Sequence, residues 1–266
     1  MKRILLTGAG GGVGRTIRPL LAARYALRVS DRVPIAHDPA EQHMPADLGD
    51  LDALRAAVRG TDGIVHLGGF SLESDFQTIL AANIVGARNL FEAARLEGVR
   101  RVVFASSNHV MGFYPRDQTI PVTATVRPDS RYGVSKAFGE GLASLYADKY
   151  GAECLVIRIG HIADKPANPR DLAVWLSPRD FVQLIAIGLD TPNLHYEIVY
   201  GMSDNARGWW DASAAQRLGY KPQDRSEDYA AEIMAKGDGL TGNPVVDLHQ
   251  GGAFAAAEDM TPPKPA

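Results

Sequence analysis

The stretch TGAGGGVG, residues 7–14, constrains the fold of this chain more than any other part of its sequence. It follows the apolar run RILL and opens a segment with the apolar spacing of an amphipathic helix. Its glycines stand in the spacing GxxGxxG, which allows a tight turn, lets the backbone approach a pyrophosphate, and packs helix closely on strand. The amino end of such a helix also attracts negative charge. The pattern predicts a dinucleotide site with contacts from Gly8, Gly11, Gly12, Val13 and Gly14.

Short apolar runs alternate with helical patterns along the first 160 residues. The runs rich in Val, Ile and Leu are RILLTG, ALRVSD, GIVHLGG, RRVVFASS and ECLVIRIG, and they are typical of strands buried on both faces of a parallel sheet. Residues 75–96 and 132–150 carry apolar side chains three and four apart, which indicates helices. This succession predicts an α/β fold, a Rossmann doubly wound parallel sheet with helices on both faces. A further strand within AEQHMPADL has little β-propensity and is expected to be short.

The regular alternation ends near residue 160, where a proline-containing loop begins. We therefore predict a dinucleotide-binding Rossmann core at residues 1–160 and a small substrate-covering portion at 161–257, interleaved with the core as one globular unit. Within the second portion the pattern predicts a helix near residues 180–189 and a strand at HYEIVYG. Residues 258–266, polar and proline-rich, are expected to form a flexible tail.

Composition limits the kinds of partner that the chain is expected to bind. A net charge of −3 gives no basic field for nucleic acid, and no apolar run reaches the roughly 18 residues of a membrane span. The N-terminus reads as a buried strand and not as a signal peptide, so a cytoplasmic protein is expected. Cys154 is the only cysteine, and the histidines show no metal-binding spacing, so neither a disulfide nor a metal site is expected.

The residues that follow the second strand should determine whether the chain binds NAD or NADP. Asp31 can accept both ribose hydroxyls of the adenosine half and repels a 2′-phosphate, which favours NAD. Arg32 leaves NADP open, because a guanidinium can also pair with a 2′-phosphate. Further contacts are predicted after the third and fourth strands, from Asp47, Leu48, Leu67, Gly68 and Gly69.

The segment RYGVSKAFGE places Tyr132 and Lys136 four residues apart, on one face of a helix. Together with TGxxGxxG, the acid after strand two, the DL pair, HLGG, Asn83 in the next helix and FASSN, this segment resembles the extended branch of the short-chain dehydrogenase/reductase superfamily. The resemblance covers nearly the whole chain. The runs GIVHLGGFS, AANIVGARNLFEAAR, RVVFASSNHVMGFYP and RPDSRYGVSKAFGE, with WWD, LGYKPQD and a late QGG, are similar to uronate dehydrogenases.

The resemblance implies a catalytic group of three residues. Tyr132 matches the base, Lys136 the lysine that binds the nicotinamide ribose and lowers the tyrosine pKa, and Ser107 the hydroxyl that holds the reacting oxygen. Asn83, Tyr132 and Lys136 are also expected to contact the cofactor. A tyrosine titrates near ~10, so a nearby ammonium and a positive nicotinamide would favour the phenolate that a base requires.

The resemblance also implies a sugar site. Its residues here are Ser71, Ser107, Asn108, His109, Tyr132, His161 and Arg170. Asn and His can bond sugar hydroxyls, and Arg can grip a carboxylate through two hydrogen bonds. This chain departs from the family at His161, where relatives have a serine that helps to hold the carboxylate. Whether its substrate carries a carboxylate is therefore left open.

The leading hypothesis is NAD-dependent oxidation of the anomeric C1 hydroxyl of a hexuronic acid, glucuronate or galacturonate, to an aldarolactone. The same chemistry on a neutral, 6-phosphorylated or 6-sulfonated aldose is the first alternative. A sugar epimerase or dehydratase and a non-catalytic NAD(P)-sensing regulator are further alternatives. The latter would be expected to lack Tyr132 or Lys136, both of which are present. A homo-oligomer is expected, with no nucleic acid or membrane partner.

Overall fold

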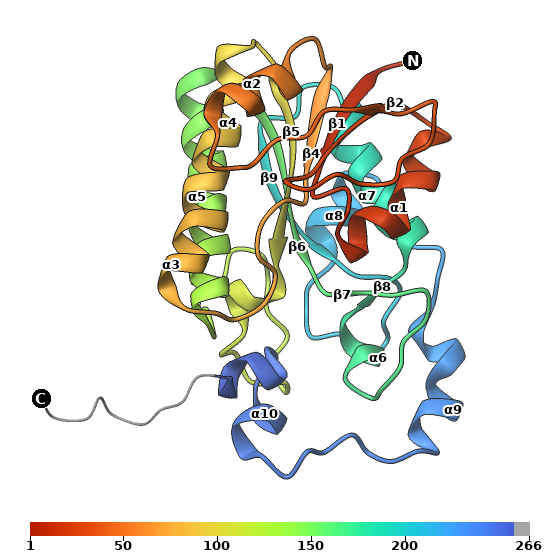
Figure 1. Cartoon of the computed structure of the whole chain (residues 1–266). Helices are drawn as coiled ribbons and strands as arrows, with labels where there is room; N and C mark the ends of the chain where they lie inside the picture. Colours follow the sequence, from red (N-terminus) through yellow and green to blue (C-terminus); the bar gives the residue numbers. More distant parts are fainter. Residues whose placement is uncertain (258–266) are drawn as a thin grey trace, which may run out of the picture.

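The structure is a computed structural model that describes residues 1–257. The predicted flexible tail, residues 258–266, lies outside the described residues. A sheet of seven parallel strands runs through the centre in the order β3-β2-β1-β4-β5-β6-β9 (Figure 1). Its strands are β1 Arg3–Thr7, β2 Ala26–Ser30, β3 Gln42–His43, β4 Gly63–His66, β5 Arg101–Ser107, β6 Glu153–Ile159 and β9 Tyr196–Gly201.

Helices cover both faces of this sheet, as the Rossmann prediction requires. On one face α2 (Leu51–Val58), α4 (Gly86–Leu96) and α5 (Arg131–Tyr150) enclose an apolar cluster around Leu54, Phe91 and Phe104. On the other face α1 (Gly12–Ala22), α7 (Pro178–Asp190) and α8 (Ser213–Arg217) enclose a second cluster around Ile17, Leu155 and Phe181. The central strands are buried on both sides, which explains their continuous apolar sequences.

The elements predicted from periodicity are present, with one change. The third strand is as short as expected, and the predicted late helix and strand appear as α7 and β9. The pattern over residues 75–96 gives α3 (Phe76–Ile79), a π-helical segment η1 (Leu80–Val85) and α4 in succession. Apolar periodicity does not reveal a π-turn, because the turn adds a single residue to the spacing.

The chain beyond residue 160 contributes β9, α7 and α8 to the layers of the main sheet, and its other elements are short. A two-stranded sheet pairs β7 (His161–Ile162) with β8 (Trp175–Leu176). The remaining elements are η2 Asn108–Met111, α6 Asp171–Val174, η3 Ser226–Tyr229, α9 Ala230–Met234, α10 Pro244–Leu248 and η4 Gly252–Ala256. The division at residue 160 stays a prediction. Within residues 1–257, no helix is both long enough and apolar enough to cross a membrane.

A buried ion pair fixes α5 against the sheet. Arg158 on β6 donates from Nε and Nη2 to the two carboxylate oxygens of Glu140 on α5, at 2.9 and 2.7 Å. The Ser106 hydroxyl donates a third bond to Glu140 at 2.6 Å. The side chains of Arg158 and Glu140 are 2% and 6% exposed, so this pairing has to satisfy both charges. It holds the helix that carries Tyr132 in register with β5 and β6.

Candidate active site

The glycine loop has the shape that a pyrophosphate requires. Gly8 has φ +66°, and a Cβ atom there would lie 2.8 Å from the Gly68 nitrogen. A Cβ at Gly14 would lie 2.4 Å from the Gly8 carbonyl oxygen, so only glycine allows α1 to approach β1 this closely. In the described part of the chain, no side chain caps the first turn of α1, which leaves its N–H groups for an anion. Gly11, Gly12 and Val13 form this end of the helix.

Asp31 follows β2 and faces the glycine loop. Its Oδ2 accepts a hydrogen bond from the Gly10 backbone N–H at 2.9 Å, and its Oδ1 accepts one from the Arg32 N–H at 2.8 Å. The Asp31 carboxylate is therefore fixed beside the loop, where it can accept ribose hydroxyls, whereas the Arg32 side chain is exposed. The residues present fit the adenosine half of a dinucleotide.

We predict that Asp31→Ala raises the KM for NAD about ten- to hundredfold, because bonds to a charged acceptor contribute about 1.5–3 kcal/mol. The preference for NAD over NADP should narrow, since the negative charge that repels a 2′-phosphate is removed. Steady-state kinetics with both cofactors measures this. Asp52→Ala, which removes a carboxylate that is 92% exposed on α2, serves as the control. An unchanged KM for NAD would contradict the assignment.

The loop after β4 closes the other side of the cofactor site. His66 Nδ1 lies 2.7 Å from Thr7 Oγ1, which accepts a bond from the Gly68 N–H at 3.2 Å. Burial lowers the pKa of His66 to about 3, so the ring is neutral. A Cβ atom at Gly68 would lie 3.1 Å from Leu48 Cδ1, which places the predicted Leu48 against this loop. Leu67 and Gly69 flank the contact, and Asp47 is exposed beside it.

Asn83 lies on the π-helical segment, and its amide is fully engaged by protein groups. Its Oδ1 accepts from the Phe70 N–H at 2.7 Å, and its Nδ2 donates to the Phe70 carbonyl at 3.0 Å and to Ser135 Oγ at 2.9 Å. Asn83 thus joins the loop after Gly69 to α5. Direct contact of Asn83 with a cofactor stays a prediction.

Ser107, Tyr132 and Lys136 come together at the carboxyl end of β5. Ser107 is the last residue of that strand and hydrogen-bonds Tyr132, and both side chains are buried. Lys136 lies one turn after Tyr132 on α5, with Nζ 5.6 Å from the Tyr132 ring centroid. Its ammonium donates to the Ala105 carbonyl at 2.8 Å. The structure therefore assembles the three residues that the sequence predicts.

Burial shifts the pKa values of Tyr132 and Lys136 in opposite directions. Burial raises the pKa of Tyr132 to about 12, the Ser107 hydrogen bond acts to lower it, and Asp129 acts to raise it. Burial also lowers the pKa of Lys136 to about 8. The Lys136 ammonium lies beside the Tyr132 ring and donates to the Ala105 carbonyl. Burial therefore opposes the phenolate form of Tyr132, and positive charge beside the hydroxyl favours it.

The predicted sugar-binding residues Asn108 and His109 continue from Ser107 on η2. His109 Nδ1 lies 2.8 Å from Asp129 Oδ2, and its ring meets the Tyr132 ring edge-on with centroids 5.8 Å apart. Asn108 is buried, and in the amide orientation that satisfies its neighbours it donates to the Ile159 carbonyl at 3.1 Å and accepts from Arg170 Nη2 at 3.3 Å. Arg170 therefore connects directly to the segment beside the catalytic group.

Arg170 is anchored at one end of its guanidinium. Its Nη2 donates to the Gln250 carbonyl at 2.7 Å, while its enclosed Nε has no hydrogen-bond partner among residues 1–257. Burial, together with the charge of Arg116, lowers the pKa of Arg170 to about 10, so the group remains a cation at neutral pH. Within residues 1–257 this half-buried arginine forms hydrogen bonds through Nη2 alone, and such a guanidinium suits a carboxylate ligand.

His161 pairs with the residue that follows Arg170 in the chain. His161 Nδ1 lies 2.9 Å from Asp171 Oδ1, and the His161 side chain is 48% exposed. This hydrogen bond raises the pKa of His161, while burial and the charge of Arg170 oppose the rise. Asp171 is itself buried and accepts bonds from the Ala167 N–H and Asn168 Nδ2. Since Nδ1 faces Asp171, the Nε2 side of His161 is the side that can donate to a ligand.

The structure connects Ser107, Asn108, His109, Tyr132 and Arg170 by contacts, and a sugar contact from Ser71 stays a prediction. Ser71 is exposed in the loop before α3 and makes no hydrogen bond within the described residues. Sequence reasoning missed several residues that hold the site, namely Glu73, Asp129, Asp171, Gln250 and Phe254. Glu73 Oε2 accepts from the Tyr132 backbone N–H at 3.0 Å. Asp129 and Gln250 belong to the runs RPDSRYG and QGG, but the patterns give no sign of what their side chains contact.

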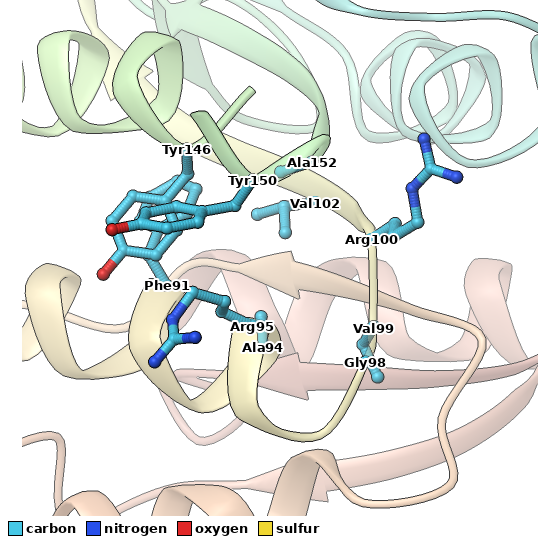
Figure 2. Close-up of a pocket in the computed structure, with 10 residues that line it drawn as sticks. All are labelled: Phe91, Ala94, Arg95, Gly98, Val99, Arg100, Val102, Tyr146, Tyr150 and Ala152. Atoms are coloured by element: carbon cyan, nitrogen blue, oxygen red, sulfur yellow. The ribbon is translucent and has the colours of Figure 1, made fainter. Parts of the chain in front are cut away.

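A cavity of about 250 Å³ lies elsewhere, at the end of the sheet where β5 begins. Figure 2 shows Phe91, Tyr146 and Tyr150 gathered on one side of it, with Arg95 beside them. Because Ser107 ends β5, this cavity and the catalytic group lie at opposite ends of the strand. Among residues 1–257 no group of three or more His, Cys, Asp or Glu side chains is arranged to hold a metal ion.

The parallel sheet, the glycine loop and the Ser107, Tyr132 and Lys136 group define a dinucleotide-dependent oxidoreductase of the extended short-chain dehydrogenase/reductase class. The chain belongs to the NAD dependent epimerase/dehydratase family, whose model matches residues 4–170.

Comparison with individual relatives narrows the similarity within that family. The chain is 48% identical to uronate dehydrogenase of Pseudomonas putida over 259 residues, which cover 96% of each protein. It is similar to the crystal structure of glucuronic acid dehydrogenase from Chromohalobacter salexigens, with a TM-score of 0.93, 46% identity and 97% of each chain covered. It is also similar to a mutant of uronate dehydrogenase from Agrobacterium tumefaciens complexed with NAD, with a TM-score of 0.92 and 44% identity over 96% of this chain and 97% of that one.

Proposed function

We propose that this protein is an NAD-dependent uronate dehydrogenase, which oxidises the C1 hydroxyl of a hexuronic acid to an aldarolactone. The similarity to uronate dehydrogenases over nearly the whole chain supports the substrate class. The structural observation that carries the proposal is the position of Arg170, an enclosed cation bonded to Asn108 at the catalytic end of the sheet. A carboxylate on the far side of a sugar ring is the group that such an arginine would bind.

The residues of the chain define the chemical step. Ser107 donates a hydrogen bond to the C1 oxygen, and Tyr132 Oη accepts the hydroxyl proton as the C1–H bond breaks and the C1=O bond of the lactone forms. Lys136, fixed by the Ala105 carbonyl, supplies a positive charge 5.6 Å from the Tyr132 ring. Bound NAD would supply the hydride acceptor and a second positive charge, held by the glycine loop and Asp31.

The proposal is tested by the absorbance of reduced nicotinamide at 340 nm with NAD and a panel of sugars. We expect turnover with glucuronate or galacturonate and little with glucose or galactose, which lack the carboxylate. Turnover only with neutral sugars would overturn the assignment of a uronic acid. No turnover with any sugar would favour a protein that binds the dinucleotide without reacting.

A second candidate substrate is a sugar with a phosphate or sulfonate on C6. The observation that favours it is His161, which together with Arg170 can place two cations at the far end of the sugar site. Glucose 6-phosphate belongs in the same panel, and a higher kcat/KM for it than for either uronate would support this candidate.

We predict that the affinity for a uronate depends on pH through His161. The pKa of His161 is raised by Asp171, so the imidazolium is present below that raised pKa and is lost as pH rises through it. The Kd of the uronate should therefore increase with pH across that range. Binding is best measured by calorimetry with a Tyr132→Phe variant saturated with NAD, which separates binding from proton transfer.

The matched variant for this prediction is His161→Gln, which keeps a hydrogen-bonding side chain without a titration. Its Kd for the uronate should be flat over the same pH range. A wild-type profile identical to that of His161→Gln would show that His161 does not bind the carboxylate.

We further propose a cytoplasmic homo-oligomer. The support for self-association is the exposure of large apolar side chains on α4 and α5, among them Leu96, Phe138 and Leu145. Light scattering coupled to size-exclusion chromatography measures the mass of the protein in solution. A monomer at micromolar concentration would contradict the proposed homo-oligomer.

A further inference from the structure

The C-terminal turn lies directly against the catalytic end of the sheet. Phe254 on η4 stacks on the His109 ring, with centroids 3.8 Å apart and planes inclined by 21°. The Phe254 ring centroid is also 5.9 Å from that of Tyr132. His109 thus has one ring face covered by Phe254, Nδ1 beside Asp129, and an edge-on contact with Tyr132. The remaining ring nitrogen, Nε2, is the atom free to meet a sugar hydroxyl.

Buried hydrogen bonds latch this turn to the rest of the site. Gln250 is 1% exposed and donates from Nε2 to the carbonyls of Pro115 and Gln118, at 2.9 and 2.8 Å. Its Oε1 accepts from Trp210 Nε1 at 2.9 Å. The backbone N–H of Gly251 donates to the Gly112 carbonyl at 2.9 Å. Such a densely bonded turn has a fixed position and is not a loose end of the chain.

The same turn also holds Arg170. The Gln250 carbonyl accepts from Arg170 Nη2 at 2.7 Å. Gly252 has φ +61°, and a Cβ atom there would lie 2.8 Å from Arg170 Nε, so the turn packs against the guanidinium at the closest approach that glycine allows. Residues 250–254, which we call the C-terminal strap, therefore contact both His109 and Arg170.

We propose that the C-terminal strap is part of the sugar site and that Phe254 is a positioning residue, which holds the His109 ring so that Nε2 faces the substrate. The strap sets the orientation of two predicted sugar-binding side chains that come from different parts of the chain. Phe254 itself acts through His109 and does not take part in proton transfer. This inference rests on the proposed sugar oxidation, so its test includes a readout that needs no turnover.

The test compares Phe254→Ala, Phe254→Tyr and Leu248→Ala, the last being an exposed side chain just before the strap. We expect Phe254→Ala to raise the KM for the uronate about three- to tenfold, in the range measured for aromatic pairs. The KM for NAD should stay within twofold of wild type, and kcat should fall less than the uronate KM rises. Phe254→Tyr should restore the wild-type KM, and Leu248→Ala should not change it.

The readout independent of activity is the NMR signal of the His109 ring, assigned with a His109→Gln variant. Loss of the stacked ring in Phe254→Ala should shift the His109 carbon-bound proton by removing the ring current, whereas Leu248→Ala should leave it in place. An unshifted signal would overturn the positioning role whatever the substrate. A shifted signal with an unchanged uronate KM would overturn the link to sugar binding. If the wild type oxidises no sugar, the proposed function fails, and the NMR result still decides the position of His109.

Discussion

Replacing Tyr132 by phenylalanine should lower kcat by a factor of about 10²–10⁴ and leave NAD binding intact. The variant loses only the hydroxyl oxygen that accepts the proton, and it keeps the ring that packs against His109 and Phe254. The hydroxyl is the group that Ser107 hydrogen-bonds, so the substrate proton loses the acceptor placed for it. Single-turnover measurement of nicotinamide reduction reports the chemical step directly.

A suitable control is Tyr146→Phe, on the same helix but with its hydroxyl bonded to Glu92 on α4. It should keep the wild-type kcat. Calorimetric titration with NAD should give similar affinities for wild type and Tyr132→Phe, which shows that the fold and the cofactor site are unaffected. A Tyr132→Phe variant with full activity would refute the mechanism.

Breaking the buried ion pair between Arg158 and Glu140 should reduce the free energy of unfolding by about 3–5 kcal/mol. Arg158→Met leaves the Glu140 carboxylate in the interior with the Ser106 hydroxyl but without its cation. Urea denaturation followed by circular dichroism, in the presence and absence of NAD, measures the loss.

Two further variants show whether charge is responsible for this effect. Combining Arg158→Met with Glu140→Leu removes both charges and should recover a large part of the lost stability, because an apolar pair of similar volume has no charge to desolvate. Arg207→Met removes an exposed guanidinium paired with Glu227 and should change stability little. Equal losses for Arg158→Met and the double variant would mean that packing, and not charge, is responsible.

The sequence was most informative where backbone geometry restricts the choice of residue. Gly8 and Gly14 can be recognised because a side chain at either position would collide with nearby backbone, and Tyr132 and Lys136 because helical spacing places them on one face. The central β-strands could also be predicted, since burial on both faces leaves few alternatives to Val, Ile and Leu.

The parts that sequence reasoning missed depend on contacts between distant segments. Gln250 and Phe254 meet Arg170 and His109 only after the chain has folded back across the sheet, and no local pattern records that contact. Asp129 and Asp171 orient His109 and His161, but an aspartate near the start of a helix is as easily an ordinary turn or capping residue. The burial that raises the pKa of Tyr132 and the Ala105 partner of Lys136 also follow from tertiary structure and not from local spacing.

The position of the C-terminal strap has a consequence for synthesis of the protein on the ribosome. The glycine loop, Asp31 and the loop after β4 all lie within the first 70 residues, so most of the groups predicted to contact the nucleotide emerge early. The Phe254 ring emerges nearly two hundred residues later, and His109 and Arg170 lack their packing partners until then. During synthesis, the residues predicted to bind the nucleotide would thus be available well before those predicted to bind the sugar. A chain truncated shortly before residue 250 would lack the residues that complete the substrate site.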